Sequence, residues 1–279
     1  MKAQNLTISV PGDKCDKNCG YCISTITWQP ENDMSLMASN VRKVKEFASK
    51  LKVPSVLFTG KKEPFLAMDE MLWLIRRFKD YWVEVQTNGI LLNKHPEEFA
   101  MKLMKFKVNV VAFSIDRLED ITKYEDTFAT LTKFGIIVRV CFNLTKEITA
   151  KHGFYSIMSE VIKRKDKSGV PFIRQVLFRN ISYPSTAAKN HPTVKWIDNN
   201  VSQVDYLSIL DQAMRANMKV IRTVSYTGIV IYSYNRLSSV CFSDYCLQET
   251  SKTEDIRSLI FHSDGHVYTS WDDPTSVLF

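Results

Sequence analysis

Three cysteines within eight residues near the N-terminus constrain this chain of 279 residues more than any other feature. They form the pattern C-x3-C-x2-C over residues 15–22 and directly follow an apolar, β-branched run at 6–10 that predicts a strand. Three thiolates on one loop can bind three irons of a [4Fe-4S] cluster, which leaves the fourth iron open to a small molecule. The spacing therefore indicates an iron–sulfur site at the end of a strand.

Three cysteines this close together also have plainer explanations. They would suit a zinc site, a disulfide with one spare thiol, or three buried thiols that share no role. Zinc commonly takes four ligands in two separated pairs, and no matching pair of His or Cys stands near this segment. The spacing therefore favours the cluster over these alternatives.

The same spacing, with an aromatic residue between the last two cysteines, resembles the signature of the radical S-adenosylmethionine (SAM) superfamily. The resemblance implies that Cys15, Cys19 and Cys22 hold a [4Fe-4S] cluster and that SAM binds its fourth iron. An electron from the cluster would then split SAM into methionine and a 5'-deoxyadenosyl radical. The resemblance also implies that Tyr21 shields the cluster and stacks near adenine. An aromatic residue at this position would equally anchor the loop on the fold.

Composition is that of a globular protein, with 45% apolar and 24% charged residues. No apolar run is long enough to span a bilayer, and the first residues lack the apolar segment of a signal peptide. Six cysteines, three of them in one loop, suit a reducing compartment in which thiols bind metal. We therefore expect a cytoplasmic protein that does not associate with membranes.

The chain is basic, with a net charge of +7 and a sequence pI near 9.0. Many of the basic residues stand on predicted helix faces, where solvated side chains explain them. The charge would also attract an anionic partner, such as a nucleotide, a nucleic acid or an acidic electron donor like flavodoxin or ferredoxin. The charge alone does not choose among these partners.

Short β-branched runs alternate with longer amphipathic runs over most of the first 180 residues, which predicts an α/β fold with a parallel sheet. The expected strands are 6–10, 55–59, 82–87, 109–115, 136–142 and 172–178, and the expected helices are 35–51, 68–79, 96–105, 121–134 and 153–165. The resemblance implies that residues 1–180 form a partial (β/α)6, TIM-like barrel. Active sites of such barrels lie at the carboxyl ends of the strands, where the cysteine loop also stands.

Residues 181–279 predict an α+β extension that closes the mouth of the barrel. A polar connector at 181–203 reads as a loop beside the mouth. A helix is expected at 204–217, and strands are expected at 220–224 and 229–234, with a turn at Thr227-Gly228 between them. Asp264-Gly265 between apolar runs predicts a β-hairpin.

The second strand ends in Thr59-Gly60-Lys61-Lys62-Glu63-Pro64. This segment resembles the T-G-G-E-P motif of the superfamily, and the resemblance implies that Gly60 and Glu63 contact the methionyl amino group of SAM. Here two lysines stand where one glycine is expected, so the loop is one residue longer. A charged turn with Pro64 at a helix start is the alternative.

Polar residues also close the next two strands. Asn88 belongs to a T-N-G segment, and Ser114 and Asp116 belong to an S-x-D segment. Both segments resemble superfamily motifs, which implies that the S-x-D pair lies near the ribose and carboxylate of SAM. Asn-Gly is also a common turn, and Ser or Asp at a strand end can cap the following helix.

The last two strands of the predicted barrel supply two further candidates. Asn143 closes the fifth strand, and the resemblance implies a bond from a polar residue there to the adenosine. It also implies that an aliphatic residue of the sixth strand, Val176 or Leu177, packs against adenine. Cys141 is expected to be a small buried residue rather than a ligand.

The C-terminal fifth faintly resembles the tail of the GTP cyclase of molybdenum-cofactor biosynthesis. Cys241 and Cys246 precede the Asp-Gly turn, and Ser270 stands where a third cysteine would be expected. Two cysteines are too few for a second cubane, so we predict a single cluster. His262 and His266 flank the turn and are expected to form a solvated or hydrogen-bonded pair.

These features together predict a radical SAM enzyme that abstracts hydrogen from an anionic substrate, such as a nucleotide or a nucleobase in a nucleic acid. Five basic residues are expected at the mouth and would favour such a substrate: Lys61, Lys62, Arg139, Arg174 and Arg179. A peptide-modifying radical SAM enzyme is the alternative. A non-catalytic iron–sulfur redox protein is the alternative from another class.

Overall fold

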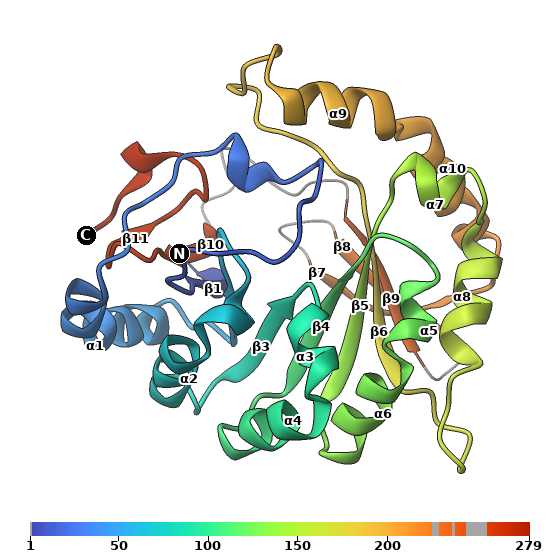
Figure 1. Cartoon of the computed structure of the whole chain (residues 1–279), viewed down its shortest axis with the longest axis horizontal. Helices are drawn as coiled ribbons and strands as arrows, with labels where there is room; N and C mark the ends of the chain where they lie inside the picture. Colours follow the sequence, from blue (N-terminus) through green and yellow to red (C-terminus); the bar gives the residue numbers. More distant parts are fainter. Residues whose placement is uncertain (1, 225–228, 236–237, 244–255) are drawn as a thin grey trace.

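The computed structural model of the chain describes residues 2–224, 229–235, 238–243 and 256–279. Its described strands form one sheet of eleven, in the order β11-β10-β1-β2-β3-β4-β5-β6-β9-β8-β7 (Figure 1). The strands are β1 Ala3–Ser9, β2 Ser55–Thr59, β3 Trp82–Thr87, β4 Val110–Ile115, β5 Ile137–Asn143, β6 Ile173–Arg179, β7 Lys219–Val224, β8 Ile229–Tyr234, β9 Ser238–Ser243, β10 Ile256–Phe261 and β11 Val267–Tyr268.

The six strands predicted for the barrel are confirmed as β1 to β6, and each pairs in parallel with the next. The C-terminal segment extends this parallel run at both ends, because β10 pairs with β1 and β9 pairs with β6 in the same direction. β11, β8 and β7 pair antiparallel at the two edges. The sheet is therefore an open, TIM-like partial barrel to which residues beyond 180 contribute strands.

Most of the helices lie along the outer side of this sheet in Figure 1, whereas α9 lies apart from them at the top of the view. The helices are α1 Met34–Lys50, α2 Met68–Arg77, α3 Ile90–Lys94, α4 Pro96–Lys105, α5 Asp120–Lys123, α6 Glu125–Lys133, α7 Lys146–Thr149, α8 Phe154–Ile162, α9 Pro192–Asn200 and α10 Gln203–Met214, with 3-10 turns η1 Ile23–Thr25, η2 Pro64–Ala67 and η3 Pro274–Ser276. α1 begins where the Asp33 side chain accepts a hydrogen bond from the Leu36 N–H, and it buries Met37, Val44 and Ala48 against the sheet.

Two predictions about helices differ from the structure. The helix expected at 121–134 is interrupted at Tyr124, which separates α5 from α6. The connector at 181–203, expected to be a loop, contains α9. Pro192 stands at the first turn of α9, where a missing N–H costs nothing, and the His191 side chain accepts from the Thr193 N–H. A proline that suggested a loop therefore starts a helix.

The C-terminal hairpin is confirmed, because β10 and β11 pair antiparallel around Gly265, whose φ is +84°. The strand β9 was not expected. The turn proposed at Thr227-Gly228 lies outside the described residues, as does Cys246. Within the described part of the chain, no helix has both the length and the apolar character needed to cross a membrane.

Aromatic packing fixes the outer face of the sheet near β6. The Phe178 ring stacks on Phe142 of β5 and on Phe242 of β9, with centroids 5.7 and 5.0 Å apart, and Phe154 of α8 covers it. Burial of each such ring contributes about 1.5–3 kcal/mol. Because β1 to β6 are parallel and packed in this way, the segments that follow them all lie at one edge of the sheet.

Candidate cofactor site

The cysteine loop lies at that edge, directly after β1. Cys15 is exposed, Cys19 and Cys22 are half-buried, and all three thiols are free. The Cys22 N–H donates to the Cys19 carbonyl at 3.1 Å, which turns the chain into η1. Burial raises the pKa of Cys15, and it raises that of Cys19 to about 11, so these thiols keep their protons at neutral pH when no metal is bound.

Tyr21 ties the cysteine loop to the ends of β4 and β5. Its hydroxyl donates a short hydrogen bond to Asp116 Oδ1. The Asn143 Nδ2 lies 2.9 Å from the Tyr21 hydroxyl, 2.8 Å from Ser114 Oγ and 3.0 Å from Asp116 Oδ1. Lys17 of the loop forms an ion pair with Asp116 at 2.6 Å. The predicted residues Tyr21, Ser114, Asp116 and Asn143 are therefore brought together in one network.

Glu63 occupies a second junction, between the loop after β2 and the end of β3. It is 4% exposed. Its Oε1 accepts from Thr87 Oγ1 at 2.7 Å and from the Phe65 N–H at 3.2 Å, and its Oε2 accepts from the Asn88 N–H at 2.9 Å. Burial raises the pKa of Glu63, and these three donors oppose the rise.

Asn88 extends this junction to the cysteine loop, since its Nδ2 donates to Asp16 Oδ1 at 2.7 Å. Gly60 is needed where the backbone is crowded. A Cβ on Gly60 would lie 3.0 Å from the Lys62 carbonyl oxygen and 3.3 Å from that of Val10. Gly60, Glu63 and Asn88 therefore bring the ends of β1, β2 and β3 together.

Val176 is not part of this group. It shares the helix-facing side of β6 with Phe178, which packs on α8, and it is 1% exposed within the apolar core. Leu177, the other candidate named for this strand, faces the opposite side and is half-buried. Of the two aliphatic candidates, only Leu177 faces away from the helices.

The expected basic mouth is only partly present. Arg139 lies within the sheet rather than at its edge, where it forms an ion pair with Glu84 and donates to Gln175 Oε1 at 2.8 Å. Glu84 raises the pKa of Arg139 against the effect of burial. Arg174 stands at the amino end of β6, at the far edge of the sheet. Arg179 ends β6 at the same edge as the cysteine loop.

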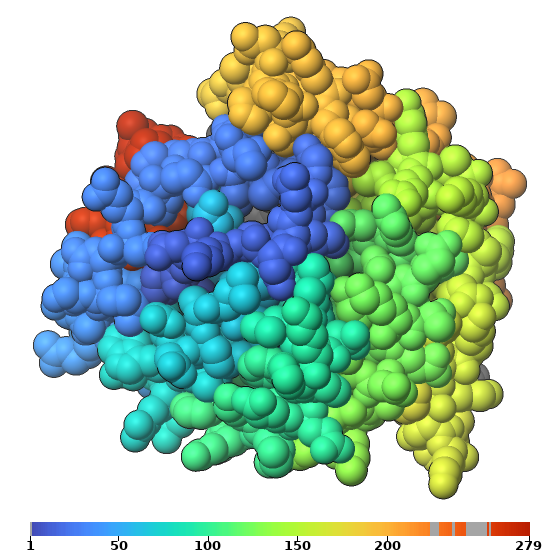
Figure 2. Space-filling model, in the orientation of Figure 1, coloured from blue at the N-terminus to red at the C-terminus, as the bar shows by residue number. Residues whose placement is uncertain are grey.

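Two residues at this edge, Lys17 and Trp196, were missed from the sequence, whereas Lys61 was expected there as a basic residue of the mouth. Lys17 forms the ion pair described above. Lys61 is buried, and Trp196 of α9 packs its indole on the cysteine loop, where Gly20 leaves room for it. Figure 2 shows the segment around α9 (gold) against the N-terminal loop (blue). The burial of Lys61 was not foreseen, and no local signal marked Trp196.

His262 and His266 do not form the expected pair of side chains. His262 is fully buried, and its ring lies 5.3, 5.2 and 4.9 Å from those of Trp28, Tyr268 and Trp271. Neither ring nitrogen makes a well-formed hydrogen bond within the described residues, although the Trp271 backbone lies near enough to favour the charged form weakly. Burial dominates and lowers the pKa of His262 to about 3.

The three cysteine thiols are the residues that would hold a cluster. Cys15, Cys19 and Cys22 lie on one loop, and all three are free. Three thiolates of one loop are the donor set of a cluster that leaves one iron open. Among the residues that the structure describes, no three His, Cys, Asp or Glu side chains converge on a single-ion site.

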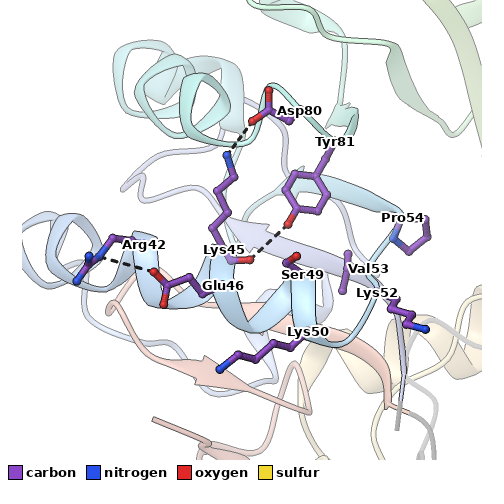
Figure 3. Close-up of a pocket in the computed structure, with 10 residues that line it drawn as sticks. All are labelled: Arg42, Lys45, Glu46, Ser49, Lys50, Lys52, Val53, Pro54, Asp80 and Tyr81. Carbon is purple, nitrogen blue, oxygen red and sulfur yellow. Dashed lines mark hydrogen bonds and ion pairs between the residues drawn. The ribbon is translucent and has the colours of Figure 1, made fainter.

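A basic groove lies at the other end of the sheet (Figure 3). It is lined by Lys50, Lys52 and Pro54 before β2 and by Asp80 and Tyr81 before β3, together with side chains of α1. Because β2 and β3 start there, the groove is opposite the cysteine loop. It is therefore not part of the cofactor site.

Comparison with known proteins defines the class. A profile of the Radical SAM superfamily matches residues 9–172, which is more than half of the chain. The chain therefore belongs to the radical SAM superfamily, whose enzymes use a [4Fe-4S] cluster and SAM and generally need an external reductant. The predicted family, partial-barrel fold and cofactors are thereby confirmed.

Two crystal structures of SuiB from Streptococcus suis are similar to this chain. SuiB bound to S-adenosylmethionine aligns with a TM-score of 0.61, and a second SuiB structure aligns with a TM-score of 0.60, each at 14% identity. Each alignment covers 97% of this chain and 60% of the SuiB chain, so this chain spans less than two thirds of SuiB. No curated protein sequence matches the chain.

Proposed function

We propose that Cys15, Cys19 and Cys22 hold the cluster and that the network around them positions SAM for reductive cleavage. When bound, the cluster and SAM supply a 5'-deoxyadenosyl radical that removes hydrogen from a substrate. The observation that carries this proposal is the junction of Tyr21, Asp116 and Asn143, which joins the cysteine loop to two strand ends. A loop held in this way presents its three thiols to one side of the sheet edge.

In this proposal, residues at the ends of β2 to β5 bind different parts of SAM. Gly60 lets the backbone approach closely, and Glu63 and Asn88 face SAM from the ends of β2 and β3. Ser114, Asp116 and Asn143 supply donors and acceptors from β4 and β5, and they exchange some of their present mutual bonds for bonds to SAM. Tyr21 keeps the loop seated.

We further propose an anionic substrate, such as a nucleotide or a nucleobase within a nucleic acid. The net charge of +7 and the position of Arg179 at the carboxyl end of β6 support this choice. Arg139 supports it less, because Glu84 neutralises its charge. The free thiols also suit a reducing compartment, so we propose that the protein works in the cytoplasm with flavodoxin or ferredoxin as reductant.

Two measurements test these steps separately. The anaerobically reconstituted protein, given dithionite and SAM, should release 5'-deoxyadenosine. A protein that binds a cluster but never forms 5'-deoxyadenosine would be a redox protein instead. Binding of oligonucleotides or nucleotides should weaken as salt rises, because phosphate contacts release counterions. Binding that does not change with salt contradicts the anionic substrate and leaves SAM cleavage standing.

A further inference from the structure

Lys61 is the one buried lysine among the described residues, with 8% of its surface exposed. It stands in the loop after β2, at the position where the superfamily motif has a second glycine, while its neighbour Lys62 is exposed. Moving an ammonium group out of water costs several kcal/mol unless neighbouring groups offset the cost. A buried lysine at this edge therefore needs an explanation from its contacts.

The Lys61 ammonium is held at a fixed place by two other segments. Its Nζ donates to Thr27 Oγ1 at 2.9 Å and to the Trp271 carbonyl oxygen at 3.2 Å. It also lies 4.8 Å from the centroid of the Trp271 ring. Thr27 follows the cysteine loop by a few residues, and Trp271 follows β11. The ammonium is thus fixed between the cysteine loop and the C-terminal segment.

The Lys61 ammonium lies beside the end of the cysteine loop. Thr27 Oγ1, which accepts from Lys61 Nζ, itself donates to the carbonyl oxygen of Ile23, the residue after Cys22, at 2.9 Å. Asp272 and, to a smaller extent, Cys22 are the negatively charged groups that favour the charged form of Lys61. Within the described residues, no carboxylate lies within ion-pairing distance of the Lys61 Nζ. By contrast, Lys17, which lies near Cys19, is neutralised at 2.6 Å by Asp116. Lys61 therefore leaves a less compensated positive charge near Cys22 than Lys17 leaves near Cys19.

We propose that the Lys61 ammonium raises the reduction potential of the cluster held by Cys15, Cys19 and Cys22. This inference rests on the proposed function. Reduction adds one electron from dithionite or a protein donor to a group that already carries three thiolates, and no bond is made or broken. A fixed positive charge in a poorly hydrated place stabilises the more negative, reduced form. Lys61 is thus a positioning residue that acts through Cys22 on electron uptake.

Reduction potentials of four variants test this inference. Wild type, Lys61→Met, Lys61→Arg and Lys62→Met are reconstituted anaerobically, and iron and sulfide are measured in each. The potential is then titrated with dithionite and followed by the EPR signal of the reduced cluster. We expect Lys61→Met to lower the reduced-to-oxidised ratio at a fixed potential at least tenfold, which is about 59 mV for one electron. Lys61→Arg should keep most of the wild-type value, and Lys62→Met all of it.

An unchanged potential in a fully loaded Lys61→Met variant would overturn the inference, as would an equal shift in Lys62→Met. If Lys61→Met does not hold a cluster, Lys61→Gln decides the matter, because its amide removes the charge and can still donate to Thr27 Oγ1. Lys61→Gln should lower the potential as Lys61→Met would, and an unchanged or higher value would count against the inference. Absence of a cluster in the wild type would contradict the proposed function instead.

Discussion

The indole of Trp196 lies directly against Gly20, so that a Cβ on Gly20 would come within 2.6 Å of the ring. Tyr21 also packs on this indole, with ring centroids 5.8 Å apart. The Thr25 and Thr193 hydroxyls meet at 2.8 Å beside them. The helix α9 is therefore docked on the cysteine loop, and glycine is the residue that permits the contact.

We predict that Gly20→Ala lowers the unfolding free energy by about 1–3 kcal/mol, because the methyl group overpacks the contact. Chemical denaturation of the metal-free protein measures this change. Gly12→Ala is the control, since its Cβ would stand at an ordinary 3.4 Å from Ala67. The double variant Gly20→Ala/Trp196→Ala should lose less than the two single variants together, and strict additivity would argue against the contact.

Asp116 joins Lys17, Tyr21 and Asn143. We predict that Asp116→Ala costs about 1–3 kcal/mol of stability, because three partly buried polar groups lose an acceptor. It should also make the reconstituted protein lose iron faster to a chelator. Glu98→Ala, which removes an exposed helical ion pair with Lys102, should leave both readouts unchanged. Equal unfolding free energies and equal rates of iron loss in the two variants would contradict the structural role of Asp116.

The pH dependence of stability should carry the signature of His262. Its pKa is lowered to about 3 in the folded chain from a usual 6.5. At pH values between these two pKa values, only the unfolded chain binds a proton at this residue. Stability in the wild type is therefore lost as pH falls from 6.5 towards 3. His262→Phe should remove this part of the acid loss and raise the unfolding free energy at pH 7 by about 1–3 kcal/mol, because two unbonded nitrogens leave the core.

The comparison that checks this is the difference in unfolding free energy between wild type and His262→Phe, measured in the metal-free protein at several pH values. The difference should widen on acidification. A constant difference would show that His262 does not titrate as its burial requires.

The pair of Arg139 and Glu84 should be strongly coupled. We predict that Glu84→Gln costs about 2 kcal/mol, because Arg139, whose side chain is only 27% exposed, keeps its charge and its bond to Gln175 but loses its carboxylate partner. Arg139→Met added to Glu84→Gln should recover much of the loss. A double-mutant cycle with no coupling would contradict the ion pair.

Patterns within short segments predicted much of this fold. The β-branched runs and the residues that close them located β1 to β6 and the polar residues at their ends, since strand identity depends on local alternation. Tyr21, Ser114, Asp116 and Asn143 meet because parallel strands bring their ends to one edge. The parallel order of the strands is enough to predict this convergence, without knowledge of any contact between distant segments.

Contacts between distant segments were beyond such patterns. Trp196 meets Gly20, and Trp271 meets Lys61, only after α9 and the C-terminal hairpin pack on the cysteine loop. Arg139 was expected at the mouth because its partner Glu84 stands two strands away, on β3, where no local pattern links the two. Pro192 suggested a loop because proline breaks a helix interior and starts a helix equally well.

Release of 5'-deoxyadenosine tests the central claim most directly. Wild type and the triple variant Cys15→Ala/Cys19→Ala/Cys22→Ala are reconstituted with iron and sulfide without oxygen, reduced with dithionite and given SAM. The account predicts about four irons per wild-type chain, together with 5'-deoxyadenosine and methionine in equal amounts, and neither cluster nor product from the triple variant. A fully loaded, reduced wild type that leaves SAM intact would contradict it.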